Sequence, residues 1–414
     1  MREINHYQGK NIAVLTAGGD TAALNNSIVS VRSAVHELGG KVYGIVDGFH
    51  GMLFNPSNAL RDINFGEIDG REGGTVLGTK RTGTDGSVPT QKIMQFLKQK
   101  NLDALVVMGG DGTSAVAQAI YEQDYPILVL PKTVDNDLIT SSTFQYSDRK
   151  IQVNLTPGYV TGADKISLGA YNVQTTASSH GRIVVMETMG RGSGYLAAAA
   201  HHGGADMLLI PELGRLSIQQ VVERIKTLYK EKKSNGDRYL LISVAEGFRM
   251  EGYAPNHHGD IGPHLKSVLQ EEFHQQKIDV DCIVKPKGYD PREGNPHDYD
   301  FKLVDLMGKH IGQLLLDGID NEGNFILNKF GRMVSLDRIV SLDHLTESHI
   351  TSILIEDSIK SNELERGRLP DEFLDRRRYA GTPLLMNFLV RVLGKARGKR
   401  KVPDFPIIDA APRD

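Results

Sequence analysis

Two aspartates separated by a single residue follow an apolar run in the first half of the chain. The run YPILVLP covers residues 125–131 and leads into Lys132, Asp135 and Asp137. Because residues two apart in an extended segment point the same way, one carboxylate could act as a general base while the other orients it or helps to hold a metal. Lys132 could neutralise charge on a phosphoryl group during transfer. An Asx-rich turn after a strand accounts for the isolated stretch almost as well.

Glycine-rich turns at two other points have the composition of phosphate-binding loops. LVVMGGDGTSAVAQAI predicts a strand, a turn at 109–113 and a helix, and AGGDTAALNN at 17–26 repeats this arrangement. Glycines let the backbone approach a phosphate, and the helix N-terminus offers free N–H groups. Asp111 suggests a divalent cation that bridges it to the phosphates. A tight turn capped by aspartate is the alternative for each stretch, but two such turns at neighbouring strand ends favour a shared polyphosphate.

Basic residues among further glycines could contact the same anion. GTVLGTKRTG carries Lys80 and Arg81, and a guanidinium there could clamp phosphate oxygens. METMGRGSG contains a Gly-x-Gly-x-Gly run at 190–194. Its spacing differs from the dinucleotide fingerprint, and no acid follows a second strand at the expected distance, so we expect no dinucleotide site there.

The elements that position these residues predict an α/β protein. Short runs rich in Val, Ile and Leu end at Gly or Pro and alternate with helical patterns, which is typical of mainly parallel sheets covered by helices on both faces. In such sheets ligands bind beyond the carboxyl ends of the strands. The polar and glycine-rich stretches fall at those ends. We expect two Rossmann-like domains with a boundary near residue 155, a loop or lid at 139–152, and a charged helical extension from 341 to 414.

Composition excludes several other classes of protein. The formal net charge is −3, with 40% hydrophobic and 24% charged residues, which predicts a globular chain with no overall attraction to nucleic acid or acidic lipid. We interpret the basic cluster at 395–401 as solvated charge.

Cys282 is the sole cysteine, so no disulfide can form within the chain, which suits a reducing compartment. No apolar run could span a bilayer and no signal peptide is present, so we predict a cytoplasmic protein.

The ordered set of motifs resembles the 6-phosphofructokinase family over roughly residues 10–340. The set is GGDTAALN, GTVLGTKR, GGDGT, PKTVDND, SSHGRIVVMETMGR, VAEGF, GYDPREGNP and FGRMV. GGDGT alone also occurs in NAD kinases and lipid kinases, but those do not continue into the later motifs. The resemblance implies a glycolytic kinase that phosphorylates the 1-hydroxyl of fructose 6-phosphate with the help of Mg²⁺.

The resemblance also implies a role for individual residues. Asp135 would be the catalytic base, Asp137 the second acid and Asp111 the magnesium ligand, with catalytic charge from Lys132 and Arg191. The donor phosphates would contact Gly19, Arg81, Gly110, Gly112 and Thr113. The sugar phosphate would contact Thr133, Asp135, Arg182, Met189, Gly190, Arg191, Glu246, Tyr289 and Arg292. Because the family lends the arginine matching Arg182 across a subunit interface, we expect a homo-oligomer, dimer or tetramer, with a shared active site.

These roles give each domain a task. Residues 1–155 would bind the donor phosphate and Mg²⁺, completed by a segment at about 296–340. Residues 156–295 would bind the sugar phosphate, and 341–414 would form the extension.

The identity of the phosphoryl donor rests on two residues that disagree. In the family, glycine at the position of Gly112 accompanies ATP, whereas lysine at the position of Lys132 accompanies pyrophosphate. We give more weight to Gly112, because a carboxylate in its place would exclude the α-phosphate by charge and bulk while a flexible lysine can move. ATP is therefore the expected donor and pyrophosphate the alternative.

Three departures from the family pattern keep a third function open. Ala22 and Ala23 replace Pro-Gly, and Glu293 replaces a glycine beside Arg292. An acid beside a sugar-phosphate arginine is compatible with a related acceptor such as sedoheptulose 7-phosphate, or with a non-catalytic paralogue that senses sugar phosphates.

Overall fold

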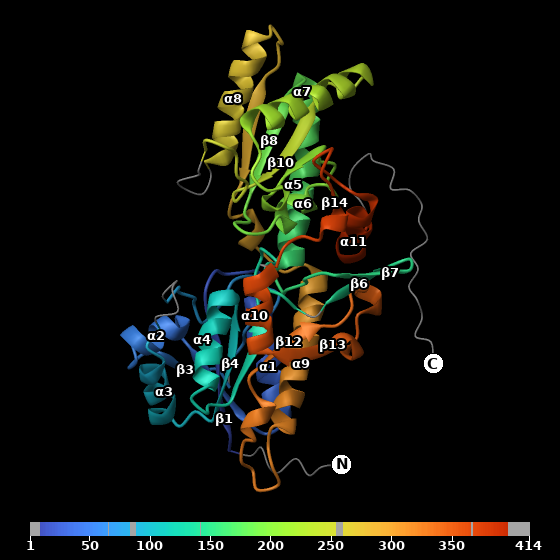
Figure 1. Cartoon of the computed structure of the whole chain (residues 1–414). Coiled ribbons are helices and arrows are strands. Elements are labelled where there is room, and N and C mark those ends of the chain that lie inside the picture. Colours follow the sequence, from blue (N-terminus) through green and yellow to red (C-terminus); the bar gives the residue numbers. More distant parts are fainter. Residues whose placement is uncertain are drawn as a thin grey trace.

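The computed structural model describes residues 9–395 except 65, 83–87, 141, 254–259 and 366. Two lobes stand end to end, each built on its own sheet (Figure 1). The α/β class that the sequence predicts is confirmed. Across the ranges just given, none of the helices combines the length and apolar character that a membrane crossing needs.

The lower lobe in Figure 1 contains a seven-stranded sheet in the order β13-β12-β5-β4-β1-β2-β3. Its five central strands are parallel, and β13 and β3 pair antiparallel at the two edges. The strands are β1 (Asn11–Thr16), β2 (Lys41–Ile45), β3 (Leu60–Asp62), β4 (Ala104–Gly109), β5 (Ile127–Pro131), β12 (Arg332–Leu336) and β13 (Ile350–Leu354).

Helices cover both faces of this sheet because successive strand residues, which point to opposite faces, are apolar. In β1, Ile12 and Val14 join one core cluster and Ala13 and Leu15 the other. Helices α1 and α9 pack together over the first cluster, and the remaining four lie over the second. The helices are α1 (Leu24–Glu37), α2 (Gly48–Phe54), α3 (Thr90–Gln99), α4 (Asp111–Tyr121), α9 (Asp298–Asp317) and α10 (Ile355–Glu365).

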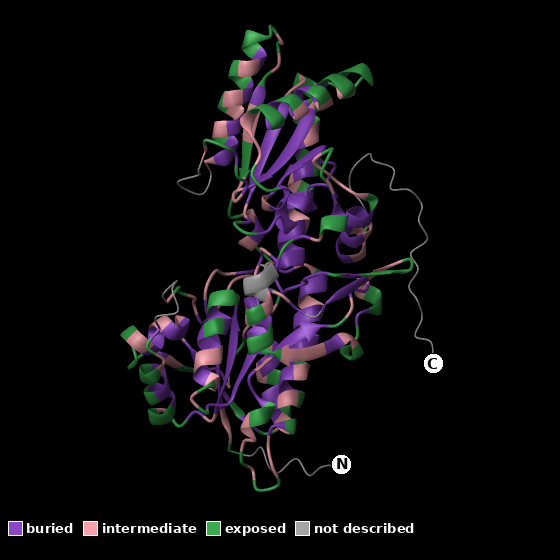
Figure 2. Cartoon of the chain, in the orientation of Figure 1, coloured by how far each residue is buried: buried purple, intermediate pink, exposed green. Residues whose placement is uncertain are grey.

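The upper lobe contains a four-stranded parallel sheet in the order β11-β8-β10-β9. Strands β8, β9 and β10 are mainly apolar and buried along their whole length, whereas the edge strand β11 is only partly buried (Figure 2). The strands are β8 (Ile183–Thr188), β9 (Met207–Leu209), β10 (Leu240–Ala245) and β11 (Cys282–Lys287). The helices are α5 (Tyr159–His180), α6 (Tyr195–Ala199), α7 (Ile218–Ser234), α8 (Ile261–Gln275) and α11 (Pro383–Leu393).

Two segments differ from what the sequence predicts. The expected loop at 139–152 contains an antiparallel hairpin, β6 (Thr143–Tyr146) with β7 (Arg149–Gln152). The hairpin is held at its base because Phe144 is buried edge-on against Phe373 and Phe388.

The expected helical extension from 341 includes α10 and α11, but it also supplies strand β13 to the first sheet and the small β14 (Leu374–Asp375) and β15 (Ala380–Gly381) pair. Of the predicted basic cluster, only Lys395 belongs to the described residues.

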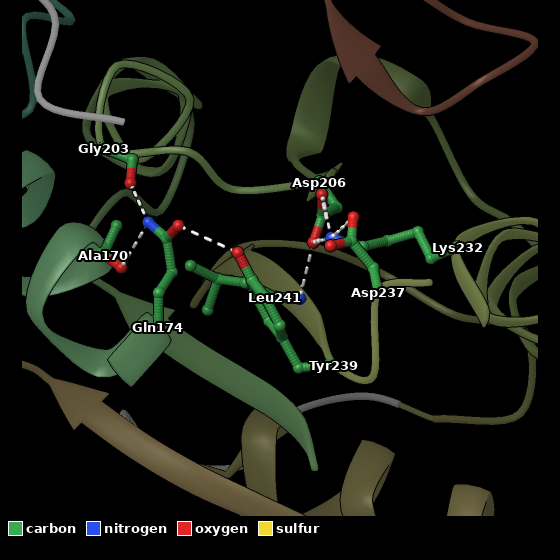
Figure 3. A network of polar contacts seen from close by, with 8 residues as sticks. All are labelled: Ala170, Gln174, Gly203, Asp206, Lys232, Asp237, Tyr239 and Leu241. Carbon is green, nitrogen blue, oxygen red and sulfur yellow. Dashed lines mark hydrogen bonds and ion pairs between the residues drawn. The ribbon is translucent and has the colours of Figure 1, made fainter. Parts of the chain in front are cut away.

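A buried polar network ties α5, α7 and the amino ends of β9 and β10 together (Figure 3). Asp206 accepts hydrogen bonds from Lys232 Nζ at 2.8 Å and from the Leu241 N–H at 2.9 Å. The Lys232 ammonium lies 4.2 Å from the centre of the Tyr239 ring, and the Tyr239 hydroxyl donates to Gln174. The network therefore braces the end of the sheet opposite to the polar strand ends.

Removing Asp206 is expected to destabilise the fold without touching the site. Asp206→Ala leaves a largely buried ammonium and a buried N–H without their closest acceptor, so we expect unfolding to become easier by about 3–5 kcal/mol. Asp237→Ala is the matched control, because this more exposed acid reaches the same lysine only at 3.7 Å, and it should cost less than about 1 kcal/mol. Chemical denaturation of both variants checks the difference, and equal losses would contradict it.

Candidate active site

A cavity of about 850 Å³ lies where the strand ends of both lobes meet. Its wall is built from the segments that follow β1, β4 and β5 in the first lobe and β8, β10 and β11 in the second. It takes in most residues that the sequence predicts for the site: Gly19, Arg81, Gly110, Asp111, Gly112, Thr113, Lys132, Thr133, Asp135, Asp137, Met189, Arg191, Glu246, Tyr289 and Arg292.

The two glycine turns meet at one edge of the cavity. A Cβ added at Gly18 would lie 3.6 Å from the Thr113 hydroxyl and 3.9 Å from Lys132 Nζ, so the turns after β1 and β4 and the start of the β5 loop converge. Helix α4 begins at Asp111 and directs its free N–H groups at this edge. A Cβ at Gly112 would meet nothing within 4 Å. The edge therefore offers N–H donors and open space, as an anion needs.

Lys132 is buried beneath the first glycine turn. Its Nζ donates to the main-chain oxygens of Ala17, at 3.0 Å, and of Gly19. Burial, together with the charge of Arg292, lowers the pKa of Lys132 to about 7. The lysine thus ties the β5 loop to the β1 turn, and its charge reaches the cavity from below the turn.

The loop after β5 is fixed by Asn136, which lies between the two aspartates. Asn136 has a φ of 55° and is completely buried, a left-handed conformation that asparagine tolerates better than most residues. Its amide donates to the Asn154 main-chain oxygen at 2.6 Å and accepts from the Thr156 N–H at 2.9 Å. These bonds anchor the turn from behind and leave the two carboxyl groups facing the cavity.

Asp135 is a partly buried acid, with its Oδ1 shielded from solvent, and it is held among other acids. Burial, together with the charges of Asp137 and Glu246, raises its pKa to about 7, against the opposing charges of Arg292 and Arg191. The pKa of Asp137 is also raised by burial, against a hydrogen bond of 3.0 Å from the Thr133 hydroxyl. A carboxyl group with a pKa near neutrality is suited to accept a proton during a reaction.

Basic residues enter the cavity from both lobes, with Lys80, Arg81 and Lys132 from the first and Arg191 and Arg292 from the second. Arg191 Nε lies 3.9 Å from Glu246 Oε1, and Arg292 Nη1 lies 3.8 Å from Asp20 Oδ1 of the first lobe. Tyr289 is 70% exposed at the rim. Because Arg191 is also largely exposed, its guanidinium can turn toward a bound anion.

The acids at this edge could hold a magnesium ion that is bound partly by the protein and partly by substrate phosphates. The charge of Asp111 raises the pKa of Asp137, so the two carboxyl groups repel each other and a cation would relieve that repulsion. Within the described ranges, no three His, Cys, Asp or Glu side chains gather into a ready-made metal cluster. One or two carboxylates usually hold Mg²⁺ together with substrate phosphates, and Asp111 and Asp137 could supply them.

Comparison with known proteins decides the family. The sequence model of the family "Phosphofructokinase" matches residues 11–315. The chain belongs to the phosphofructokinase family. It is 33% identical to an ATP-dependent 6-phosphofructokinase of Chloroflexus aurantiacus, over 76% of this chain and 86% of the relative. It is 30% identical to a pyrophosphate–fructose 6-phosphate 1-phosphotransferase of Dictyoglomus thermophilum, over 79% and 91%.

The fold is that of solved phosphofructokinases. The structure of a pyrophosphate-dependent phosphofructokinase from Nitrosospira multiformis superposes with a TM-score of 0.73 at 17% identity, over 94% of this chain and 92% of that one. The predicted family and phosphotransferase class are thus confirmed, while the residue roles stay predictions.

Two predicted site residues do not line the cavity of this phosphofructokinase chain. Gly190 lies between two lining residues and has a φ of 122°, which suits only glycine. Arg182 precedes β8, at the amino end of the second sheet, and pairs with Asp281 at 2.6 Å. Within one chain Arg182 therefore lies away from the cavity.

The residues that hold the loop at 135–137 from outside were not predicted from the sequence. Asn136 could have been suspected because asparagine between two acids at a strand end tolerates a left-handed turn. Ser193 donates to the Asp135 main-chain oxygen at 2.7 Å, and the local pattern around it gives no signal of that contact. Glu293 is exposed and does not line the cavity, so the acid beside Arg292 faces away from it.

Asp135→Asn is expected to stabilise the protein in a pH-dependent way. Since the pKa of Asp135 is raised on folding, the unfolded chain releases this proton first and the folded state loses stability as pH rises from about 4 to about 7. Asparagine does not ionise, so the gain in melting temperature should grow from pH 5 to pH 8. Asp148→Asn, at the exposed tip of the β6–β7 hairpin, is the control. A gain that is constant or falls with pH would contradict the assignment.

Proposed function

We propose that this phosphofructokinase transfers the terminal phosphoryl group of ATP to the 1-hydroxyl of fructose 6-phosphate in glycolysis, with Mg²⁺. One observation carries the proposal: the partly buried Asp135, whose pKa is raised to about 7, shares a cavity with two glycine turns and with basic residues of both lobes. A kinase needs a base at the acceptor hydroxyl and positive or N–H groups around the phosphates.

The residues divide the reaction between the two lobes. The donor phosphates lie on the turns at Gly19 and at 110–113, with Arg81 on their outer side, and the sugar phosphate lies toward Arg292 and Tyr289. The oxygen of the 1-hydroxyl forms a bond to the γ-phosphorus as the bond to the bridging oxygen breaks, and the hydroxyl proton passes to Asp135. The products are fructose 1,6-bisphosphate and ADP.

Charge on the transferring group is balanced by neighbours. Arg191 turns from Glu246 toward the phosphoryl oxygens, and Thr133 holds Asp137 in place beside the base. Mg²⁺ held at Asp111 would neutralise charge on the donor phosphates. Met189 and Glu246 contact the sugar.

Gly112 supports ATP over pyrophosphate as the donor. The space where its side chain would project is open, so a third phosphate can lie there, and Phe49 and Val116 add apolar wall nearby. The Chloroflexus relative is named as ATP-dependent. Pyrophosphate is the second candidate, because Lys132 lies beneath the phosphate turns and the Dictyoglomus relative is named for that donor.

Arg182 supports an active site shared between subunits. It can reach a sugar phosphate only if a second copy places it there, since its own cavity lies at the other end of β8. Leu168 and Tyr171 are more than 40% exposed on α5, on either side of Gly169, which lies against the Lys287 side chain of β11, and they would pack against that copy. We place the homo-oligomer in the cytoplasm, which its lone, buried Cys282 suits.

Purified protein should therefore convert fructose 6-phosphate with Mg²⁺ and ATP. Asp135→Ala should lower kcat by about 10²–10⁴-fold with little change in KM, because the base acts mainly in the transition state. Coupled assays with ATP and pyrophosphate in separate runs check both points, with sedoheptulose 7-phosphate as a second acceptor. Absence of turnover with either donor would contradict the proposal and favour the alternative function, a non-catalytic paralogue that senses sugar phosphates.

Gly112→Asp should depress use of ATP. A carboxylate projecting into the open space beside the α4 N-terminus would repel the α-phosphate of ATP more than it would disturb a two-phosphate donor. We expect kcat/KM for ATP to fall at least tenfold while any activity with pyrophosphate is kept or raised. Gly112→Ala, which adds bulk without charge, is the matched control. Unchanged ATP kinetics in Gly112→Asp would show that this position does not select the donor.

A further inference from the structure

The segment that crosses from α10 to α11 lies against the catalytic loop. It starts at Gly367, beyond the end of the family match at residue 315, and it connects a helix of the first lobe with a helix of the second. Gly367 has a φ of 53°, and a Cβ added there would overlap the carbonyl oxygen of Asp137. The crossing segment, residues 367–369, therefore touches the main chain of the loop that carries both aspartates.

Glu212 joins this segment to the loop that carries Arg191. Its Oε1 accepts the N–H of Leu369 at 2.9 Å and the N–H of Gly194 at 2.8 Å. Its main-chain oxygen accepts a hydrogen bond of 2.7 Å from Arg376 Nη1. Glu212 is 6% exposed and does not line the cavity. One buried carboxyl oxygen thus connects two backbone N–H groups, of Gly194 and Leu369, that are 175 residues apart.

The connection closes on the catalytic base. Ser193, next to Gly194, donates its hydroxyl to the main-chain oxygen of Asp135 at 2.7 Å. The contacts form a ring: the loop at 135–137, the loop at 191–194, Glu212, and the crossing segment that returns to Asp137. A further bond of 2.8 Å, from Ser358 on α10 to the Ile139 oxygen, holds the same loop from the first lobe.

We propose that Glu212 and the crossing segment act as a clamp that sets the distance between Asp135 and Arg191, which makes Glu212 a positioning residue for phosphoryl transfer. The inference rests on the proposed function. Its physical basis is that misplacing a catalytic group by about 1 Å can cost about a hundredfold in rate. Without Glu212 two backbone N–H groups lose a buried acceptor, so both loops gain freedom.

The oxygen atoms of Glu212 determine which substitution keeps the clamp. Oε1 makes both hydrogen bonds, whereas Oε2 is buried and has no hydrogen-bond partner among the described residues. Glutamine can present its oxygen to the two N–H groups, so Glu212→Gln keeps the acceptor. Leucine has a similar size but no acceptor, so Glu212→Leu removes it.

A glycine pair tests the contact with Asp137. Gly367→Ala should lower kcat at least tenfold and change KM for fructose 6-phosphate less than threefold, because the added methyl pushes the Asp137 peptide group. Gly236→Ala is the matched control: Gly236 has a φ of 87°, but a Cβ there would meet nothing within 4 Å. It also places alanine at a positive φ, but far from the loop, and should keep wild-type kcat. Equal kcat values in the two variants would overturn the proposal.

The Glu212 pair provides a second, independent readout. Glu212→Gln should keep more than half of the wild-type kcat, whereas Glu212→Leu should lose at least tenfold and shift the acidic limb of the kcat–pH profile, since the surroundings of Asp135 change. Loss of melting temperature in Glu212→Leu with kcat and pH profile unchanged would overturn the clamp. If Gly367→Ala does not fold, the Glu212 pair decides alone. An inactive wild-type protein would instead contradict the proposed function itself.

Discussion

Partial burial of the Asp135 carboxyl group is the constraint on which this site depends. Removing a carboxylate from water raises its pKa, and two further acids, Asp137 and Glu246, raise it more. The group then stays close to the point at which it can bind or release a proton at neutral pH. Such an arrangement opposes folding, so it persists only where the surrounding structure fixes it. The hydrogen bonds of Asn136 to residues 154–156 supply that support from within the first lobe.

The two parallel sheets give this carboxyl group its reaction partners. Each sheet sends its polar loops to its carboxyl edge, and the two edges face one cavity. The first lobe contributes groups suited to a polyphosphate, and the second contributes arginines and Glu246. Residues that bridge the lobes, such as Arg292 near Asp20 and Ser193 bonded to the Asp135 main chain, set how the two sets meet. The chemistry is therefore a property of the interface between the lobes.

Much of the site could be predicted because its signals are local. Apolar strands followed by Gly, Asp or Arg identify the cavity wall, and the order of the motifs identifies the family. The placement of Lys132 could not be predicted. A lysine in the sequence indicates a positive charge, but the main-chain carbonyl groups of Ala17 and Gly19 determine where that charge lies. Glu212 and Gly367 gave no signal, because their partners are distant in sequence and their contacts involve backbone atoms. Strand β13 was not predicted for a similar reason: an edge strand forms by pairing with its neighbour, here β12, which is not visible from the local sequence.

A crystal structure of the protein with fructose 6-phosphate, Mg²⁺ and a non-hydrolysable ATP analogue tests the central claim most directly. The quantity to measure is the distance from the Asp135 carboxylate to the oxygen of the 1-hydroxyl. The account predicts about 2.6–3.2 Å, with the donor phosphates on the turns at Gly19 and Gly112. A sugar bound with its 1-hydroxyl against another residue, and Asp135 out of hydrogen-bond reach, would contradict the assignment of Asp135 as the base.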